Sequence, residues 1–232
     1  MRLFLHHFRL TLATGALLLA SCTPFTTPEA TQPTAPTPAI ATPIVTNPPN
    51  TQVSGVELLG VITIPNDTVA FDTIVGGLSA IAYDSESDAY YFLSDDRATI
   101  GPTRIYQAAI NLDDGTLEEG DLTWTGVIPL LDESGAPFAQ GALDTEGLVY
   151  AGENFYLSTE GDVSIQPPIA PAIIEFTSAG EYVTSLPLPD NFMPNTDGSY
   201  GVRNNQGLES LTRTPDGRYL ISGTENALAQ DG

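Results

Sequence analysis

Acidic side chains recur at matching places in three stretches of this chain. Each stretch begins with a Gly-Leu step, continues through an aromatic and aliphatic run, and ends in a carboxylate. The three Gly-Leu steps are Gly77-Leu78, Gly147-Leu148 and Gly207-Leu208. The acids that follow the runs are Asp95, Asp96, Glu160 and Glu225, and the second and third stretches also begin with a glutamate, Glu146 and Glu209.

These carboxylates could bind a hard metal ion if the fold brings them together. Clustered carboxylates raise one another's pKa unless a cation compensates their charge, and calcium prefers ligation entirely by oxygen. Bound calcium could polarise a phosphoryl oxygen and lower the pKa of a bound water. We therefore predict a calcium site. The candidate ligands are Asp95, Asp96, Asp144, Glu160, Glu209 and Glu225, and the candidate catalytic residues are Glu146, Glu160, Glu209 and Glu225.

Three arginines are candidate substrate ligands. We interpret Arg97, Arg104 and Arg203 as phosphate-binding residues, because a guanidinium group binds phosphate oxygens in a bidentate manner. The alternative is structural: aspartates recur at turns for local reasons, and Arg97 could simply pair with Asp95 or Asp96. The glutamates favour a function more strongly, since glutamate is a poor turn residue and recurs here in register.

Composition narrows the possible chemistry. The formal net charge is −22, no lysine is present, and the two histidines are His6 and His7. If the N-terminal segment is removed, histidine-dependent serine or cysteine catalysis and His-ligated zinc are excluded. A strongly acidic chain without a basic surface also argues against nucleic-acid binding. Carboxylates, arginines, tyrosines and hard metals remain.

The first 54 residues are expected to lie outside the fold. Residues 1–21 have a basic start and a short apolar run, as a signal peptide does. The sequence Leu19-Ala20-Ser21-Cys22 resembles the lipobox of bacterial lipoproteins, which implies an exported protein anchored to the envelope membrane by lipid on Cys22. A plain secretory signal with a chance cysteine is the alternative. Residues 22–54 are rich in Thr and Pro and are predicted to be a disordered linker.

From residue 55 onward the pattern predicts an all-β domain. Short runs of strand-forming residues alternate with turn signals such as Pro215-Asp216-Gly217, and no sustained helical period appears. The predicted strands are 56–63, 78–83, 89–94, 104–111, 122–131, 147–150, 154–159, 172–177, 181–186, 207–213 and 218–223. The repeats favour a β-propeller over a sandwich. About three blades are present where a closed ring needs more, so we interpret residues 55–232 as the N-terminal part of a propeller.

Several motifs together resemble one known family. Residues 76–84, Asp144-Thr145-Glu146-Gly147-Leu148 and residues 205–211 are similar to steps of the family described as esterase-like activity of phytase. The resemblance covers about residues 56–232. It implies a phytase-like, propeller-like hydrolase of the envelope that acts on a small phosphorylated substrate. Two alternatives stay open: a non-catalytic propeller that binds a ligand or partner, and an inactive truncated fragment.

Overall fold

The computed structural model describes residues 55–232 of the 232-residue chain, which form one compact unit. The predicted signal peptide, the lipidated Cys22 and the Thr/Pro-rich linker fall on residues 1–54 and lie outside the described residues. From residue 55 on, no helix is long and apolar enough to cross a membrane.

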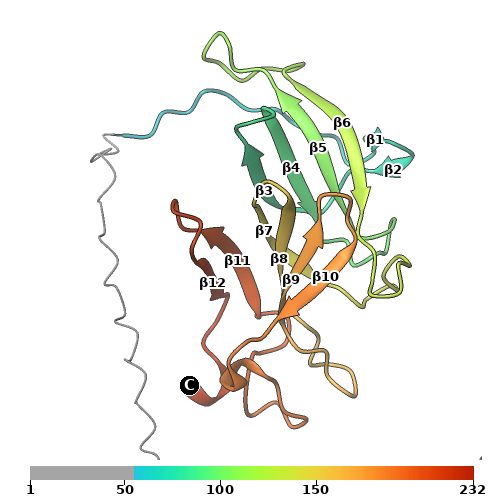
Figure 1. Ribbon diagram of the computed structural model, residues 1–232, viewed down its shortest axis with the longest axis vertical. Helices are drawn as coiled ribbons and strands as arrows, with labels where there is room; N and C mark the ends of the chain where they lie inside the picture. Colours follow the sequence, from blue (N-terminus) through green and yellow to red (C-terminus); the bar gives the residue numbers. More distant parts are fainter. Residues whose placement is uncertain (1–54) are drawn as a thin grey trace, which may run out of the picture. The chain divides into compact units, whose positions relative to one another are not determined.

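Three antiparallel sheets carry the domain (Figure 1), and their strands are as follows. The first sheet has the order β3 (Leu78–Asp84), β4 (Ala89–Ser94), β5 (Arg104–Ile110) and β6 (Leu122–Pro129). The second pairs β7 (Thr145–Tyr150), β8 (Asn154–Thr159), β9 (Ala172–Thr177) and β10 (Tyr182–Leu186) in chain order. The third is the hairpin of β11 (Leu208–Arg213) and β12 (Leu220–Thr224). The prediction of an all-β, partial propeller is confirmed.

The first strands of the three sheets are neighbours. β7 contacts both β3 and β11, so the starting edges of successive sheets lie side by side, as the inner strands of propeller blades do (Figure 1). The approach of β7 to β11 depends on Gly147: a Cβ there would lie 2.5 Å from the Leu211 amide nitrogen. Any side chain at this position would push the inner strands apart.

Apolar side chains alternate along the strands and fill the space between sheets. Tyr91 of β4 packs edge-on against Phe155 of β8, with ring centroids 5.0 Å apart, and both are buried. Leu93 and Leu157 join the same cluster and are fully buried. Between the second sheet and the third hairpin, Leu208 and its neighbours on β11 form a smaller cluster. Two separate interfaces therefore bind the three sheets together.

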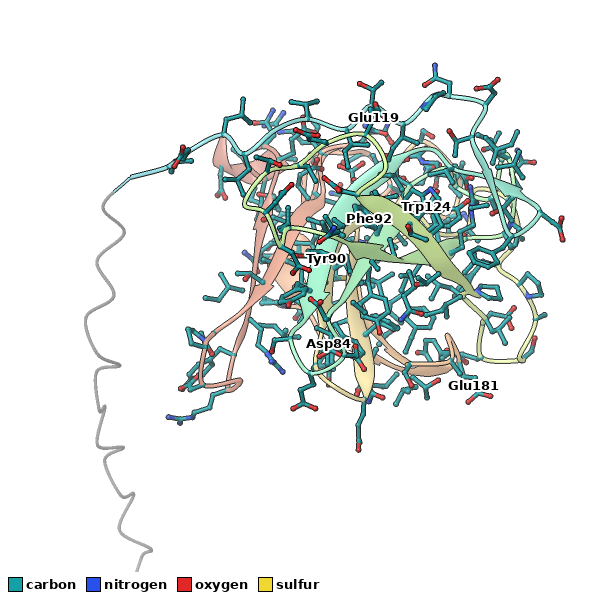
Figure 2. All side chains as sticks on the ribbon, turned by 90° about the horizontal axis from the view of Figure 1, so that it is seen from above. Asp84, Tyr90, Phe92, Glu119, Trp124 and Glu181 are labelled. Carbon is teal, nitrogen blue, oxygen red and sulfur yellow. The ribbon has the colours of Figure 1, made fainter. Side chains whose placement is uncertain are left out.

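The other face of the first sheet has its own aromatic cluster. Figure 2 shows Phe92 and Trp124 close together on this sheet, and their ring centroids are 5.4 Å apart. Tyr106 joins them and is fully buried. A short ribbon of β1 (Val69–Ala70) and β2 (Thr73–Ile74) lies against this cluster. These two-residue strands were not predicted.

One predicted strand is wrong. Residues 56–63 are mostly apolar and include the β-branched Val61 and Ile62, yet the segment lies outside the sheets and has one bridge, Gly60 to Leu117. Val56 is 98% exposed and Leu58 81% exposed. A run of strand-forming residues becomes a strand only where a sheet edge is available to pair with it. The other predicted strands are all present, with small shifts at their ends.

Candidate functional site

The structure shows which residues of the three repeats are equivalent, and it corrects the register of the second. The Asp95 amide donates to the Gly77 carbonyl at 2.7 Å, and the Glu225 amide donates to the Gly207 carbonyl at 3.0 Å. In the second repeat the same bond runs from Glu160 to Asp144, at 3.1 Å. Asp144, rather than Gly147, is therefore the counterpart of Gly77 and Gly207. The equivalent triplets are Gly77-Leu78-Ser79, Asp144-Thr145-Glu146 and Gly207-Leu208-Glu209.

A β-bulge follows each of these positions. Pairing slips by one residue after Leu78 in β3 and after Leu208 in β11, and a matching irregularity follows Thr145 in β7. Bulges re-aim side chains and are common beside active sites. Glu146 and Glu209 both lie in the irregular step. In the second and third repeats the residue in this step, Glu146 or Glu209, lies close to the acid at the end of the same hairpin.

The acids from these hairpins gather into one cluster. A carboxylate oxygen from each of Asp144, Glu146 and Glu160 lies within 4.8 Å of the others, and the same holds for Glu160, Glu209 and Glu225. Glu160 belongs to both sets and is 3% exposed, and Asp144 is 8% exposed. Glu209 and Glu225 are exposed. The cluster is therefore buried at the second repeat and open to solvent at the third.

Short polar contacts fix the second hairpin against its neighbours. The Thr145 hydroxyl donates to the Ser94 carbonyl at 2.9 Å, and the Ser79 hydroxyl donates to the Thr145 carbonyl at 3.1 Å. On the other side, the Gly207 amide donates to Glu160 Oε1 at 3.1 Å. Glu160 is thereby oriented by the third repeat, although its backbone belongs to the second.

Glycine makes room for the acids at two equivalent positions. Gly77 has a φ of +57°, and a Cβ there would lie 2.0 Å from Asp95 Oδ1. A Cβ on Gly207 would lie 2.4 Å from the Glu160 carbonyl oxygen. Both glycines are therefore required by the close approach of a neighbouring acid residue, and this explains why two repeats begin with glycine.

Burial and mutual repulsion raise the pKa values of the clustered acids. Burial raises the pKa of Glu146 to about 8, with Glu209, Asp144 and other acids adding to the rise. Burial likewise raises the pKa of Glu160 to about 7; Asp144 adds to this rise, while the Gly207 amide opposes it. Without a cation, this pair therefore retains protons near neutral pH.

The pKa values of two further acids shift in the same direction. Burial is the largest cause of the raised pKa of Glu209, and the negative charges of Glu225 and Asp144 raise it further. Burial is also the largest cause of the raised pKa of Asp95. The negative charge of Asp144 raises it further, and the positive charge of Arg97 opposes the rise. Asp95 therefore lies close enough to Asp144 and Arg97 for their charges to act on it.

Arg97 is the cation that the fold places at this cluster. Its Nη2 forms an ion pair with Asp144 and donates to Asn205 Oδ1 at 2.9 Å. The side chain is 37% exposed. Arg97, Ala98 and Asn205 have left-handed backbones, with φ values of 52°, 55° and 52°. Such conformations cost energy for non-glycine residues and concentrate at functional sites.

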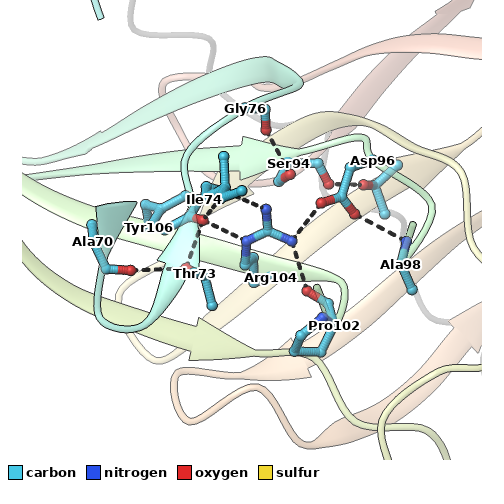
Figure 3. Close-up of polar contacts among 11 residues, drawn as sticks. Ala70, Thr73, Ile74, Gly76, Ser94, Asp96, Ala98, Pro102, Arg104 and Tyr106 are labelled. Carbon is cyan, nitrogen blue, oxygen red and sulfur yellow. Dashed lines mark hydrogen bonds and ion pairs between the residues drawn. The ribbon is translucent and has the colours of Figure 1, made fainter. Parts of the chain in front are cut away.

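Arg104 lies in a different environment, shown in Figure 3. Its side chain is fully buried, and Nη1 donates to Asp96 Oδ2 at 2.6 Å and to the Pro102 carbonyl at 3.0 Å. Nε donates to the Tyr106 hydroxyl at 2.6 Å, and Nη2 donates to the Ile74 carbonyl at 2.8 Å. These bonds tie the β1–β2 ribbon to the first sheet. The guanidinium has a structural role and does not fit the predicted phosphate contact.

Two further predicted site residues are also engaged elsewhere. Asp96 is turned toward Arg104, and its Oδ1 accepts a bond from the Ala98 amide at 3.0 Å. Asp95 and Asp96, although adjacent, therefore serve different sites. Arg203 donates from Nε to the Ala227 carbonyl at 2.9 Å and from Nη2 to the Gly232 carbonyl at 2.6 Å. Its bonds brace the loop after β12 rather than reaching the acids.

Asn205 was not predicted as a site residue, although it lies in the motif before β11. Its left-handed backbone and its bond to Arg97 link the third repeat to the first. Asparagine adopts this conformation more readily than most residues, so an asparagine two residues before the repeated glycine is a signal that could have indicated a special turn.

The residues present fit a divalent cation. Every donor is an oxygen, which suits calcium, and calcium–oxygen distances are about 2.3–2.6 Å. Two ligands on opposite sides of one ion would therefore lie about 5 Å apart, and the 4.8 Å limit of each triplet is compatible with that spacing. Asp144, Glu160, Glu209 and Glu225 would hold such an ion, and Glu146 lies beside them as the third member of the first triplet.

The fold is similar to parts of two solved structures. One is a periplasmic gluconolactonase from Pseudomonas aeruginosa: 12% identity, a TM-score of 0.37, and coverage of 65% of this chain and 37% of that chain. The other is a putative 6-phosphogluconolactonase from Bacteroides uniformis: 14% identity, a TM-score of 0.30, and coverage of 66% and 51%. The chain thus spans about a third to a half of the length of these structures.

At the level of sequence, no curated protein matches the chain. A family model does match: the model for phytase-like proteins, described as esterase-like activity of phytase, covers residues 73–232. This range includes the three hairpins, both acid triplets and Arg97, and it amounts to well over half of the chain. The protein therefore belongs to the phytase-like family.

Proposed function

We propose that the acid cluster binds calcium and that the site formed around it hydrolyses a small phosphorylated ester. The observation that carries the proposal is the convergence of equivalent hairpin ends on two triplets of carboxylates that share the buried Glu160. Membership of a family described by an esterase-like activity supports a hydrolase. The pKa shifts support a cation, because it would relieve the repulsion among these acids.

Each residue would have a distinct task. Asp144, Glu160, Glu209 and Glu225 would hold the cation, which would supply charge stabilisation and a more acidic bound water. Glu146, with a pKa of about 8 in the metal-free site, can hold a proton near neutral pH. A general acid or base works best when its pKa lies near the working pH. Glu146 is thus suited to donate a proton to the leaving alkoxide oxygen.

Arg97 is the substrate ligand that remains from the three predicted arginines. Both of its contacts use Nη2, and among residues 55–232 its Nε and Nη1 have no hydrogen-bond partner. A guanidinium carries five N–H donors in a fixed plane. Arg97 can therefore keep its ion pair with Asp144 and still present donors to a phosphate oxygen beside the acids.

Hydrolysis of p-nitrophenyl phosphate by the full chain tests this proposal. We expect turnover with calcium, loss of turnover after chelation, and recovery when calcium returns. Glu160→Gln should lower turnover by about 100-fold or more, because the cation's contribution to the barrier is several kcal/mol. Glu153→Gln is the matched control, since Glu153 is exposed and lies in the turn at the opposite end of the same hairpin.

The competing role is a propeller that binds a ligand or partner without catalysis. Calcium binding that requires Glu160, together with no hydrolysis of any phosphoester, would favour this role and contradict the enzymatic proposal. Calcium-independent turnover that survives Glu160→Gln would contradict the metal site itself.

We also propose an envelope location with lipid on Cys22 as the anchor. The support is the sequence of residues 1–22, which lies outside the described residues. Metabolic labelling with a fatty acid should mark the wild-type chain and leave Cys22→Ser unlabelled. Labelling of that variant would contradict the proposed anchor.

A further inference from the structure

Two of the chain's arginines lie in one cavity far along the third hairpin from the acids. Of the 29 acidic residues only Glu29 precedes residue 55, so the described part has 28 acids against five arginines and no lysine. Arg213 and Arg218 both line a cavity of about 420 Å³ at the second sheet and the third hairpin. In so acidic a domain, this pairing concentrates positive charge at one place.

These two arginines differ from the other three in their contacts. Arg97 and Arg104 form ion pairs, and Arg203 donates to two backbone carbonyls. Within residues 55–232, the side chains of Arg213 and Arg218 take part in no ion pair or hydrogen bond. The Arg218 guanidinium lies over the Tyr219 ring, 5.5 Å from its centroid. Two guanidinium groups thus retain their hydrogen-bonding capacity in the same cavity.

One carboxylate also lines the cavity, and its oxygen is engaged with other groups. Glu175 Oε1 accepts a bond from Asn154 Nδ2 at 2.5 Å and another from the Tyr156 hydroxyl at 2.9 Å. Burial and Glu175 raise the pKa of Tyr156, and Arg213 opposes this rise, so Arg213 lies close to the same tyrosine. Glu175 therefore orients the tyrosine rather than neutralising either arginine.

The rest of the lining is aromatic and aliphatic. Tyr156 and Tyr219 contribute rings, and Leu186 and Leu220 contribute aliphatic side chains. Tyr156, Leu186 and Leu220 also pack against the core between the second sheet and the third hairpin, which gives the cavity a firm floor. A ligand that fits both parts of this lining carries an anionic group next to an apolar one.

The cavity is separate from the acid cluster. Glu209 and Arg213 are four residues apart on β11, which at about 3.3 Å per residue is about 13 Å along the strand. One hairpin therefore has carboxylates at its entrance and guanidinium groups at its far end. An anion at the far end would escape the repulsion of the clustered acids.

We propose that this cavity is a second binding site, specific for a phosphomonoester with an aromatic or aliphatic substituent. Guanidinium groups bind phosphate oxygens through paired, charge-assisted bonds. The tyrosine rings and leucines would contact the substituent. The site does not depend on the metal centre proposed above, and it assigns a role to the two arginines that the acid cluster does not use.

Calorimetric titration of the full chain with phenyl phosphate, in a chelating buffer, tests this site. Binding should be at least about 10-fold tighter than that of inorganic phosphate. Each of Arg213→Gln and Arg218→Gln should weaken it by about 10-fold, as expected for the loss of a charged hydrogen bond, and the double variant should not bind. Both arginines are exposed, so these variants should keep the wild-type melting temperature.

Arg97→Gln is the matched control, because it removes the exposed guanidinium beside the acids and should leave this binding unchanged. The proposal is overturned if the wild type does not bind phenyl phosphate, if the double variant binds as the wild type does, or if Arg97→Gln abolishes binding. Equal affinity for phenyl phosphate and inorganic phosphate would contradict the apolar half of the site. The titration is carried out in chelator, without the calcium that the proposed hydrolysis requires. A failure to bind phenyl phosphate is therefore distinct from a failure to hydrolyse a phosphoester.

Discussion

Two arginine–aspartate ion pairs arise from one short stretch of this chain, and their surroundings differ completely. The Arg104–Asp96 pair is closed: the side chains are 0% and 5% exposed, and the guanidinium also bonds a tyrosine hydroxyl and two carbonyls. The Arg97–Asp144 pair is open, with side chains 37% and 9% exposed. Next to it lie Glu146 and Glu160, whose pKa values are raised.

A structural ion pair and a site that can bind a ligand or metal differ in how fully their charges are matched. In the closed pair the two charges are matched, and four of the five guanidinium N–H groups are hydrogen-bonded inside the fold. In the open pair a single guanidinium faces several carboxylates, so negative charge remains in surplus. That surplus requires protons or a cation, and it makes the open site responsive to pH and to metal.

The largest expected effect is on the closed pair. Arg104→Met should lower the free energy of unfolding by about 3–5 kcal/mol, because Asp96 would be left buried and unpaired. Urea denaturation of the metal-free protein measures this change. The double variant with Asp96→Asn should recover part of the loss, and a loss below about 1 kcal/mol in the single variant would mean that the pair is not closed.

A smaller but specific effect is expected from calcium on the open site. Calcium at about 100 times its Kd should add about 2.7 kcal/mol to the stability of the wild type. Glu160→Gln should abolish this gain because Glu160 belongs to both triplets, whereas Glu225→Gln should reduce it only in part. Thermal unfolding with and without calcium measures the difference, and an equal response of the two variants would contradict the shared role of Glu160.

The next effect is on pH dependence. Glu146 and Glu160 have pKa values of about 8 and about 7 in the folded protein, against an ordinary value of 4.5. The folded state therefore binds more protons than the unfolded chain between these values, and the stability of the metal-free protein must fall as pH rises from about 5 to 8. Glu146→Gln should flatten the dependence of melting temperature on pH. A melting temperature that rises over this range would contradict the assigned shifts.

The smallest effect on stability is expected at Arg97. Because its side chain is 37% exposed, Arg97→Gln should change the free energy of unfolding by less than about 1 kcal/mol. The same variant should raise the KM for a phosphoester, since the donors beside the acids are lost. A destabilisation as large as that of Arg104→Met would remove the distinction between the two pairs.

The sequence was sufficient to predict ten of the twelve strands and the acids at their ends, because strand-forming runs and turn residues are local signals. It was not sufficient for the register of the second repeat. There Asp144 occupies the place that glycine holds in the other two, and the Gly147-Leu148 step three residues later imitates the motif. Gly147 has its own cause, the close approach of β7 to β11, and only the sheet pairing distinguishes these reasons.

The roles of the arginines were also beyond the sequence. Arg97 and Arg104 both follow acids at short range, and local spacing does not tell which of them is buried. The partner that buries Arg104 is the β1–β2 ribbon, which contributes the carbonyl of Ile74 from 30 residues away. That ribbon pairs over only two residues in each strand, too few to give a recognisable pattern.

The most direct test of the account is a calorimetric titration of calcium into the chelator-treated full chain at pH 7, in buffers of different ionisation enthalpy. Calcium should bind with release of a proton, because the proton held by the ligand Glu160 must leave when the cation binds. Glu160→Gln should lose this binding and Glu153→Gln should keep it. Absence of calcium binding, or binding that Glu160→Gln leaves unchanged, would contradict the claim that the converging hairpins form a metal centre.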